Sequence, residues 1–318
     1  MCVFTYKKYT CILIMELLNI RMFNWKQGQC SGLAKTTDII LLNENCTIYN
    51  KPINNAKTIF INTRLKHRLI LKFINTMLPL LVHPINLIIG GEDYTFPNNM
   101  DKRMSGGIFP KNKLKTLINH KFINKIFVEN LDSHLPKTIP IPLGINPREC
   151  STSIKYFEKF YNLDVNKPLK ITNFNRVREG KGQDQERGEV LKLCQNDWSQ
   201  YYVKTNETNN EAYLQEMGKY LFTICVHGGG LDVNPKLFEA LLIGVIPIIK
   251  ENKPYTNIYI KLDLPVVIIS EWSNSTITHD NLIAWKDKYY KYFENPESRN
   301  KMLTMLSLDY YADYVSRF

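Results

Sequence analysis

Short apolar stretches alternate with longer segments of helical periodicity along most of this chain. The pattern predicts strands at 38–42, 58–62, 85–89, 125–129, 138–142, 169–174, 201–204, 221–226, 245–249 and 264–269. It predicts helices at 65–78, 113–119, 150–168, 185–193, 209–218, 234–243, 280–293 and 297–318. Apolar strands alternating with helices are typical of mainly parallel sheets covered on both faces, so we expect an α/β fold.

The alternation is interrupted only once, by the polar and aromatic segment 150–168, which we interpret as a connection between two domains. Two Rossmann-like domains are expected, one at 1–150 and one at 151–318, with parallel sheets facing across a cleft. Residues 1–36 carry no clear pattern. The length of the C-terminal segment would allow the last helix to cross back to the first domain.

The most informative stretch runs from Tyr220 to Lys250. An apolar strand, 221–226, is followed at once by Gly228, Gly229 and Gly230, where the missing Cβ atoms let the backbone approach a ligand closely. Asn234 is a plausible helix N-cap, and Gly244 ends the helix before the next strand. The unit is a parallel crossover whose loop lies at the carboxyl edge of the sheet, where open α/β sheets bind ligands.

The chemistry of this loop favours a diphosphate joined to a sugar. The glycine amides, the positive end of the helix and Lys236 all favour phosphate groups. Glu239 lies one turn further on the same helical face, where a carboxylate can accept hydrogen bonds from sugar hydroxyls. A surface ion pair between Glu239 and Lys236 is the alternative interpretation.

Three familiar motifs are absent from the sequence. A hydrolase that uses His-Gly-Gly-Gly for its oxyanion hole also needs a strand-borne G-x-S-x-G after it, and none follows His227. The dinucleotide fingerprint G-x-G-x-x-G and the Walker A ending G-K-S/T are also missing.

The composition indicates a globular protein with an anionic ligand or partner. The formal net charge is +11, although a solvated lysine-rich surface explains such an excess equally well. Seven cysteines are scattered without metal-binding spacing, which is typical of reduced thiols. Glu16 and Arg21 interrupt the apolar start, so we expect no signal peptide, no transmembrane segment and a cytoplasmic location.

The segment Cys225-Val-His-Gly-Gly-Gly-Leu-Asp-Val-Asn-Pro-Lys-Leu-Phe-Glu-Ala240, followed by Gly244-Val-Ile-Pro-Ile248, resembles the exostosin-like glycosyltransferases. Phe127-Val-Glu-Asn130, Ile139 to Gly144 and the acidic loop Gly90-Gly-Glu-Asp93 are similar to N-terminal segments of that family. The chain departs from the commoner pattern, because Val-Asn-Pro-Lys replaces a Thr-His-Arg before the glutamate helix. Lys236 is the expected substitute for the missing basic residue.

The resemblance implies a GT-B fold and an inverting, metal-independent transfer of a sugar from a nucleoside-diphosphate sugar, with UDP-sugar as the expected donor and no further cofactor. The acceptor would be a hydroxyl of a glycan or glycoprotein, activated by Asp93 as first choice of base and Glu92 as second. A loop-capping role for Asp93 is the alternative. The implied donor-binding residues are Asn173, Asn175, Arg187, His227, Gly228, Gly229, Gly230, Asp232, Asn234, Lys236 and Glu239.

A non-catalytic binder of polyanions or nucleic acid is the competing function. Such a protein would be expected to cluster Lys and Arg with aromatic residues on one element, whereas here the positive charge is spread over both halves. We therefore expect no nucleic-acid partner. The sequence leaves the oligomeric state open.

Overall fold

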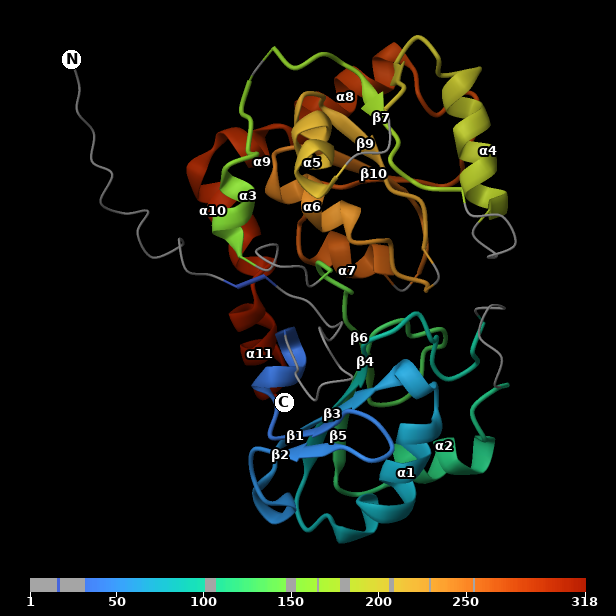
Figure 1. The fold of residues 1–318 in the computed structure, drawn as a ribbon, viewed down its shortest axis with the longest axis vertical. Coiled ribbons are helices and arrows are strands. Elements are labelled where there is room, and N and C mark those ends of the chain that lie inside the picture. Colours follow the sequence, from blue (N-terminus) through green and yellow to red (C-terminus); the bar gives the residue numbers. More distant parts are fainter. Residues whose placement is uncertain are drawn as a thin grey trace, which may run out of the picture.

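The computed structural model describes residues 16–17, 32–100, 107–146, 153–164, 166–177, 184–205, 209–228, 230–253 and 255–318. Each half of the chain forms its own sheet, and Figure 1 shows the two sheets in separate lobes, each accompanied by helices.

The first sheet has the strand order β2-β1-β3-β4-β5-β6. Its strands are β1 (Ile39–Leu41), β2 (Thr47–Tyr49), β3 (Thr58–Asn62), β4 (Ile85–Gly90), β5 (Ile123–Val128) and β6 (Thr138–Pro140). Strand β2 pairs antiparallel with β1 and forms one edge, while the remaining pairs are parallel. The continuous apolar runs in the sequence agree with this arrangement, because parallel strands are usually buried on both faces.

Both faces of the first sheet are buried, and successive residues of a strand pack into different cores. Ile59 and Ile61 of β3 belong to one cluster, which includes Leu69 and Phe73 of α1 (Arg68–Thr76). Phe60, between them, belongs to another cluster that extends into the second half of the chain. The alternation follows from the period of two along a strand.

The second sheet contains only parallel pairs, in the order β11-β10-β9-β7-β8. Its strands are β7 (Ile171–Thr172), β8 (Tyr202–Val203), β9 (Phe222–Ile224), β10 (Ile246–Lys250) and β11 (Val267–Ile269). The other α-helices described are α2 (Lys111–Asn119), α3 (Ile154–Glu158), α4 (Asp184–Gln195), α5 (Asn210–Gly218), α6 (Lys236–Leu242), α7 (Tyr255–Lys261), α8 (His279–Tyr289), α9 (Lys291–Glu294), α10 (Pro296–Met305) and α11 (Leu308–Ser316). Short 3₁₀ segments lie at Gly32–Thr36, Ile53–Asn55, Thr63–Leu65 and Leu78–Leu80.

Two helical predictions are wrong in their extent. Of the helix expected at 150–168, only the five residues of α3 are α-helical among the residues described there. The two expected C-terminal helices are four, because the first divides into α8 and α9 at Tyr290 and the second into α10 and α11 at Ser307. Asn295, in the expected gap, and Ser307 have extended backbone, and their side chains cap α10 and α11. Each cap accepts hydrogen bonds from the first amides of the next helix, which starts it in a new direction.

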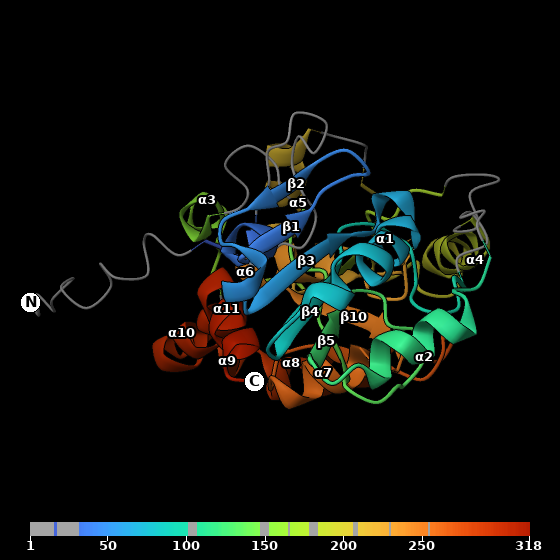
Figure 2. The ribbon, with the colours of Figure 1, turned by 90° about the horizontal axis from the view of Figure 1, so that it is seen from below.

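The last helix returns to the first sheet. Asn86 of β4 donates its side-chain amide to the carbonyl of Val315 at 2.9 Å. Phe127 of β5 packs against Tyr314 and Phe318, with ring centroids 5.9 and 5.8 Å apart. Figure 2 shows α11 on one side of the first sheet and α1 with α2 on the other.

The expected fold class is confirmed: the chain is α/β, with two Rossmann-like sheets of mainly parallel strands. The predicted boundary at residue 150 falls outside the described residues and stays a prediction. None of the helices in the described ranges combines the length and the apolar character needed to cross a bilayer.

Candidate functional site

The predicted donor-binding residues lie along one edge of the second sheet. Strands β10, β9 and β7 are neighbours and run parallel, so their carboxyl ends meet at the same edge. Asn173 follows β7, His227 follows β9 by three residues, and Lys250 ends β10. This is the edge at which a parallel sheet places its ligands.

Three buried asparagines form a chain across this edge. Asn173 accepts hydrogen bonds from the backbone and side-chain amides of Asn175, at 3.0 and 2.8 Å. Asn175 in turn accepts from the side chain of Asn234 at 3.1 Å. Asn234 then accepts from the backbone N–H of Lys236 at 3.0 Å, which opens α6. These hydrogen bonds fix the end of strand β7 against the start of α6. The three asparagine side chains are thus hydrogen-bonded to other groups of the protein.

Arg187 of α4 is buried, and its guanidinium is held at the loop after β9. Its Nε donates to the carbonyl of His227 at 3.0 Å, and Nη1 donates to the carbonyl of Arg176 at 2.9 Å. A Cβ added at Gly228 would lie 3.9 Å from Nη2. The positive charge is therefore fixed directly beside the glycine loop.

His227 places a neutral imidazole at the same point. Burial lowers its pKa, the charges of Lys250 and Arg187 lower it further, and Glu186 opposes them. Glu186 and Lys250 form an ion pair beside the ring. Among the described residues, Nδ1 of His227 is buried and has no hydrogen-bond partner. A buried polar atom in that condition is a natural contact for a ligand.

Glu239 is buried on α6 and is held by an aromatic side chain from α5. The hydroxyl of Tyr213 donates to Glu239 Oε2 at 2.8 Å. The Tyr213 ring packs edge-on against the ring of Phe174, with ring centroids 4.8 Å apart. The thiol of Cys225 has a pKa of about 12, mainly because of burial, with Lys236 lowering and Glu239 raising it. Both charged side chains of α6 therefore lie close to the end of β9. Glu239 is only 3% exposed, so it does not form a surface ion pair.

Asp232 and Gly230 are engaged with the first half of the chain. Asp232 accepts hydrogen bonds from the hydroxyl of Tyr259 and the backbone N–H groups of Val233 and Leu143. Gly230 packs against Asn130 so closely that a Cβ would lie 2.2 Å from its Oδ1. Gly229 is outside the described residues.

The predicted acceptor-side carboxylates follow β4 in the first sheet. Glu92 pairs with Arg64, with Oε1 and Nη1 2.6 Å apart. Asp93 is half-buried beside it. Glu129, buried at the end of β5, accepts from the backbone N–H of Gly91 at 2.6 Å and so fixes the start of this acidic loop.

Sequence reasoning gives no role to several residues of this region, among them Asn130, Tyr213, Glu186 and Lys250. Asn130 links the two groups of candidates, because its side chain contacts both the acidic loop and the loop after Gly230. It stands in the string Phe127-Val-Glu-Asn130, whose only signal in the sequence is its similarity to an exostosin-like segment. Tyr213 has no local signal in the sequence, since its partner Glu239 lies 26 positions away.

No group of three or more His, Cys, Asp or Glu side chains with the geometry of a metal site occurs in the described part of the chain.

No protein-family model matches this chain, and no curated protein matches it, so the exostosin-like resemblance is not confirmed. Among solved structures it is similar to the crystal structure of TarM, with 8% identity and a TM-score of 0.44 over 83% of this chain and 55% of that one. The chain thus spans about half the length of TarM.

Two further similar structures contain UDP compounds. One is the E. coli structure described as trehalose-6-phosphate bound with UDP-2-fluoro glucose, with 10% identity, a TM-score of 0.43, and coverage of 82% of this chain and 72% of that one. The other is the pneumococcal O-GlcNAc transferase GtfA in complex with UDP and GlcNAc, with 11% identity, a TM-score of 0.38, and coverage of 86% and 61%. At such scores the likeness carries no argument about activity, and the proposal below rests on the residues of this chain.

Proposed function

We propose that this protein is a glycosyltransferase that moves a hexosyl or pentosyl group from a nucleoside-diphosphate sugar, with UDP-sugar as the expected donor, to a hydroxyl of a glycan or glycoprotein. The observation that carries the proposal is the Arg187 guanidinium, fixed by two backbone carbonyls beside Gly228 at the carboxyl end of β9. A rigid cation at a glycine loop suits a diphosphate, because guanidinium N–H groups pair well with phosphate oxygens.

The donor would be bound by side chains of the second sheet. Arg187 and Lys236 would neutralise the diphosphate, and the buried Nδ1 of His227 would meet one of its oxygens. Glu239, oriented by Tyr213, would accept hydrogen bonds from the ribose hydroxyls. The helix α6 is only seven residues long and its first amide is taken by Asn234, so we assign the anion chiefly to side chains.

The chemical step would be an in-line displacement. The acceptor oxygen attacks the anomeric carbon, the bond from that carbon to the diphosphate oxygen breaks, and the hydroxyl proton passes to a carboxylate. Asp93 is the first choice of base and Glu92, which pairs with Arg64, is the second. The positive groups of the donor site would stabilise the charge that develops on the departing diphosphate without a metal ion. Among glycosyltransferases, the string at 225–240 favours an exostosin-like enzyme.

Ligand binding by the whole protein tests this proposal. Thermal unfolding and calorimetric titration would use UDP, other nucleoside diphosphates, UMP and a single-stranded oligonucleotide. We expect stabilisation by one or more diphosphates and a much weaker effect of UMP. Stabilisation by the oligonucleotide and by no diphosphate would identify a polyanion-binding protein instead.

Two substitutions test the residues. Lys236→Ala and Glu239→Gln should each weaken binding of the diphosphate by roughly 10- to 100-fold, the range for losing one charge-assisted hydrogen bond. Lys253→Ala provides the control, since it removes an exposed lysine that follows β10 and is paired with Glu251. Unchanged affinity in both site variants would remove the assignment, provided that their unfolding midpoints match that of the parent protein.

A further inference from the structure

The side chain of Asn130 lies between the acidic loop of the first sheet and the glycine loop of the second. Its Oδ1 accepts from the backbone N–H groups of Leu231 and Asp232, at 2.8 and 3.1 Å. Its Nδ2 donates to the carbonyl of Glu92 at 3.1 Å. Three of the four hydrogen-bonding positions of one amide thus join loops that are about 140 positions apart in the chain.

The backbone at both ends of this bridge is adapted to it. Asn130 has a φ of 57°, in the left-handed region where asparagine is tolerated better than most residues. Gly230 lies so close to it that any Cβ would overlap the amide, at 2.2 Å from Oδ1 and 2.5 Å from Cγ. The absence of a side chain at the third glycine of the loop is therefore explained by its contact with Asn130.

A second row of hydrogen bonds crosses the same junction. The N–H of Leu131 donates to the hydroxyl of Tyr255 at 2.6 Å, and the N–H of Leu143 donates to Asp232. Tyr255, Tyr259 and Asp232 are all buried.

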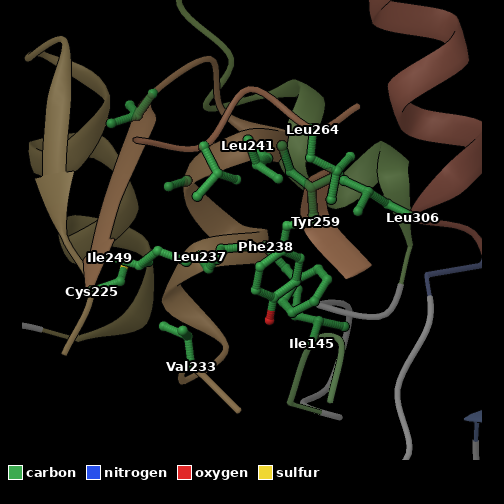
Figure 3. Packing of buried hydrophobic residues seen from close by; sticks show 14 of the residues in the cluster. Ile145, Cys225, Val233, Leu237, Phe238, Leu241, Ile249, Tyr259, Leu264 and Leu306 are labelled. Carbon is green, nitrogen blue, oxygen red and sulfur yellow. The ribbon is translucent and has the colours of Figure 1, made fainter. Parts of the chain in front are cut away.

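Apolar side chains border these hydrogen bonds. Figure 3 shows Ile145, from the segment after β6, beside the rings of Phe238 and Tyr259. Water is largely excluded from the junction, which strengthens its hydrogen bonds and makes a broken one costly.

We propose that Asn130 is a positioning residue that holds the Glu92–Asp93 loop in fixed register with the glycine loop after β9. The inference rests on the proposed function for its catalytic consequence, whereas the coupling between the two loops is independent of it. In a sugar transfer the base must lie within about 3 Å of a hydroxyl that itself faces the donor, and a displacement of about 1 Å can cost 100-fold in rate. One amide that bonds to both loops sets that distance.

The structural half of the inference is tested by hydrogen exchange in the full-length protein. Asn130→Gly removes the bridge and tolerates the same backbone angle. The amides of Leu231 and Asp232 should then exchange at least tenfold faster. The control is Asp263→Gly, which makes the same kind of change at a φ of 53° on the surface of the second half. Exchange as slow as in the parent protein would overturn the bridge.

A double-mutant cycle gives a second readout without activity. Gly230→Ala should raise the unfolding equilibrium constant, because the new methyl group meets the Asn130 amide. Combining it with Asn130→Gly removes the clash. The unfolding equilibrium constant of the double variant should therefore be at least tenfold smaller than the value obtained by multiplying the fold-changes of the two single variants. Simple multiplication of those effects would contradict the contact.

Kinetics separate this inference from the proposed function. If the protein transfers sugar, Asn130→Gly should lower kcat at least tenfold while the Kd of UDP and the KM of the donor change less than threefold. Asn130→Asp keeps the acceptor for Leu231 and Asp232 but replaces the donor to Glu92 with a negative oxygen, so it should also lower kcat. A normal kcat with faster exchange would overturn the positioning role alone. Failure of the parent protein to bind any diphosphate would overturn the proposed function. The coupling between the two loops would then be decided by the hydrogen-exchange experiment alone.

Discussion

The imidazole of His227 shows how one residue can be set by its surroundings. Burial and two nearby cations, Lys250 and Arg187, keep the ring neutral and hold its pKa below 6.5, while Glu186 acts in the opposite direction. A neutral ring can lie beside a phosphate without the cost of burying a third positive charge. The ring lies beside the Arg187 guanidinium, so the site combines a positively charged side chain with a neutral polar one.

This lowered pKa predicts a loss of stability in mild acid. Between the folded-state pKa of His227 and about 6.5, the unfolded chain binds a proton that the folded protein does not, so the free energy of unfolding falls as the pH drops below about 6.5. The slope from this residue is at most about 1.4 kcal/mol per pH unit. Urea unfolding of the parent protein and of His227→Gln between pH 7.5 and 5 measures it, because the variant lacks this contribution.

Other histidines also contribute to the acid response, since burial lowers the pKa of His67 and of His120. The quantity of interest is therefore the difference between the two proteins. His134→Gln, at an exposed position, controls for the loss of an imidazole as such. Parallel pH profiles for the parent protein and His227→Gln would contradict the prediction.

Individual elements differ in how much of their structure the sequence determines. The strands β4 and β9 and the helix α6 were predicted from continuous apolar runs and helical spacing, and Gly244 ends α6 as expected, with a φ of 76°. By contrast, α7 was missed, because its aromatic and β-branched residues are more typical of strands. It is helical where Tyr255 and Tyr259 can reach Leu131 and Asp232, which are contacts that no local pattern reveals.

A buried lysine from the segment before β7 lies against the C-terminal end of α6 and gives a second pH prediction. Lys167 Nζ donates to the carbonyl of Gly244 at 3.1 Å, and burial lowers the pKa of this amine from 10.5 to about 8. Between those values the unfolded chain binds more protons, so the lysine contributes a stability that rises with pH from 8 to 10.5. The total is on the order of 3 kcal/mol.

Lys167→Met isolates this contribution, since it keeps a flexible apolar stem and removes the charge. Measured by urea unfolding at pH 7.5, 8.5 and 9.5, the parent protein should gain stability relative to the variant as the pH rises. Lys170→Met is a suitable control, because that amine is exposed and lies on the same segment. A constant difference between the parent protein and Lys167→Met would show that the amine is not buried as described.

At the scale of the whole molecule, the two halves are joined by groups that lie far apart in the sequence. Asn130 and Gly230 are 100 positions apart, yet the side chain of Asn130 fills the space that a Cβ at Gly230 would need. The glycine loop could be predicted from three consecutive glycines. The different contacts of these glycines could not be predicted, because Gly230 packs against Asn130 and Gly228 lies beside Arg187. No local pattern in the sequence reveals that Leu143 and Tyr259 donate hydrogen bonds to the carboxylate of Asp232.

The hydrophobic core is also shared between the halves. One cluster contains Phe60 and Phe127 of the first sheet together with Ile224 and Ile248 of the second. It reaches the first sheet partly through α11, where Val315 is 3% exposed and its carbonyl accepts from Asn86. Because one core spans both sheets, we expect the two halves to unfold together.

Val315→Ala tests this coupling. Removing two buried carbon atoms between α11 and the first sheet should lower the free energy of unfolding by roughly 1–3 kcal/mol. In a Trp25→Phe background, the fluorescence of Trp198, Trp272 and Trp285 reports on the second half, and hydrogen exchange of the β3 and β4 amides reports on the first. Both signals should shift by the same amount, whereas Ser316→Ala, on the exposed side of α11, should shift neither. If the β4 amides exchanged rapidly while the tryptophan signal stayed native, the halves would be separate folding units, and the register between donor and acceptor loops would rest on the Asn130 junction alone.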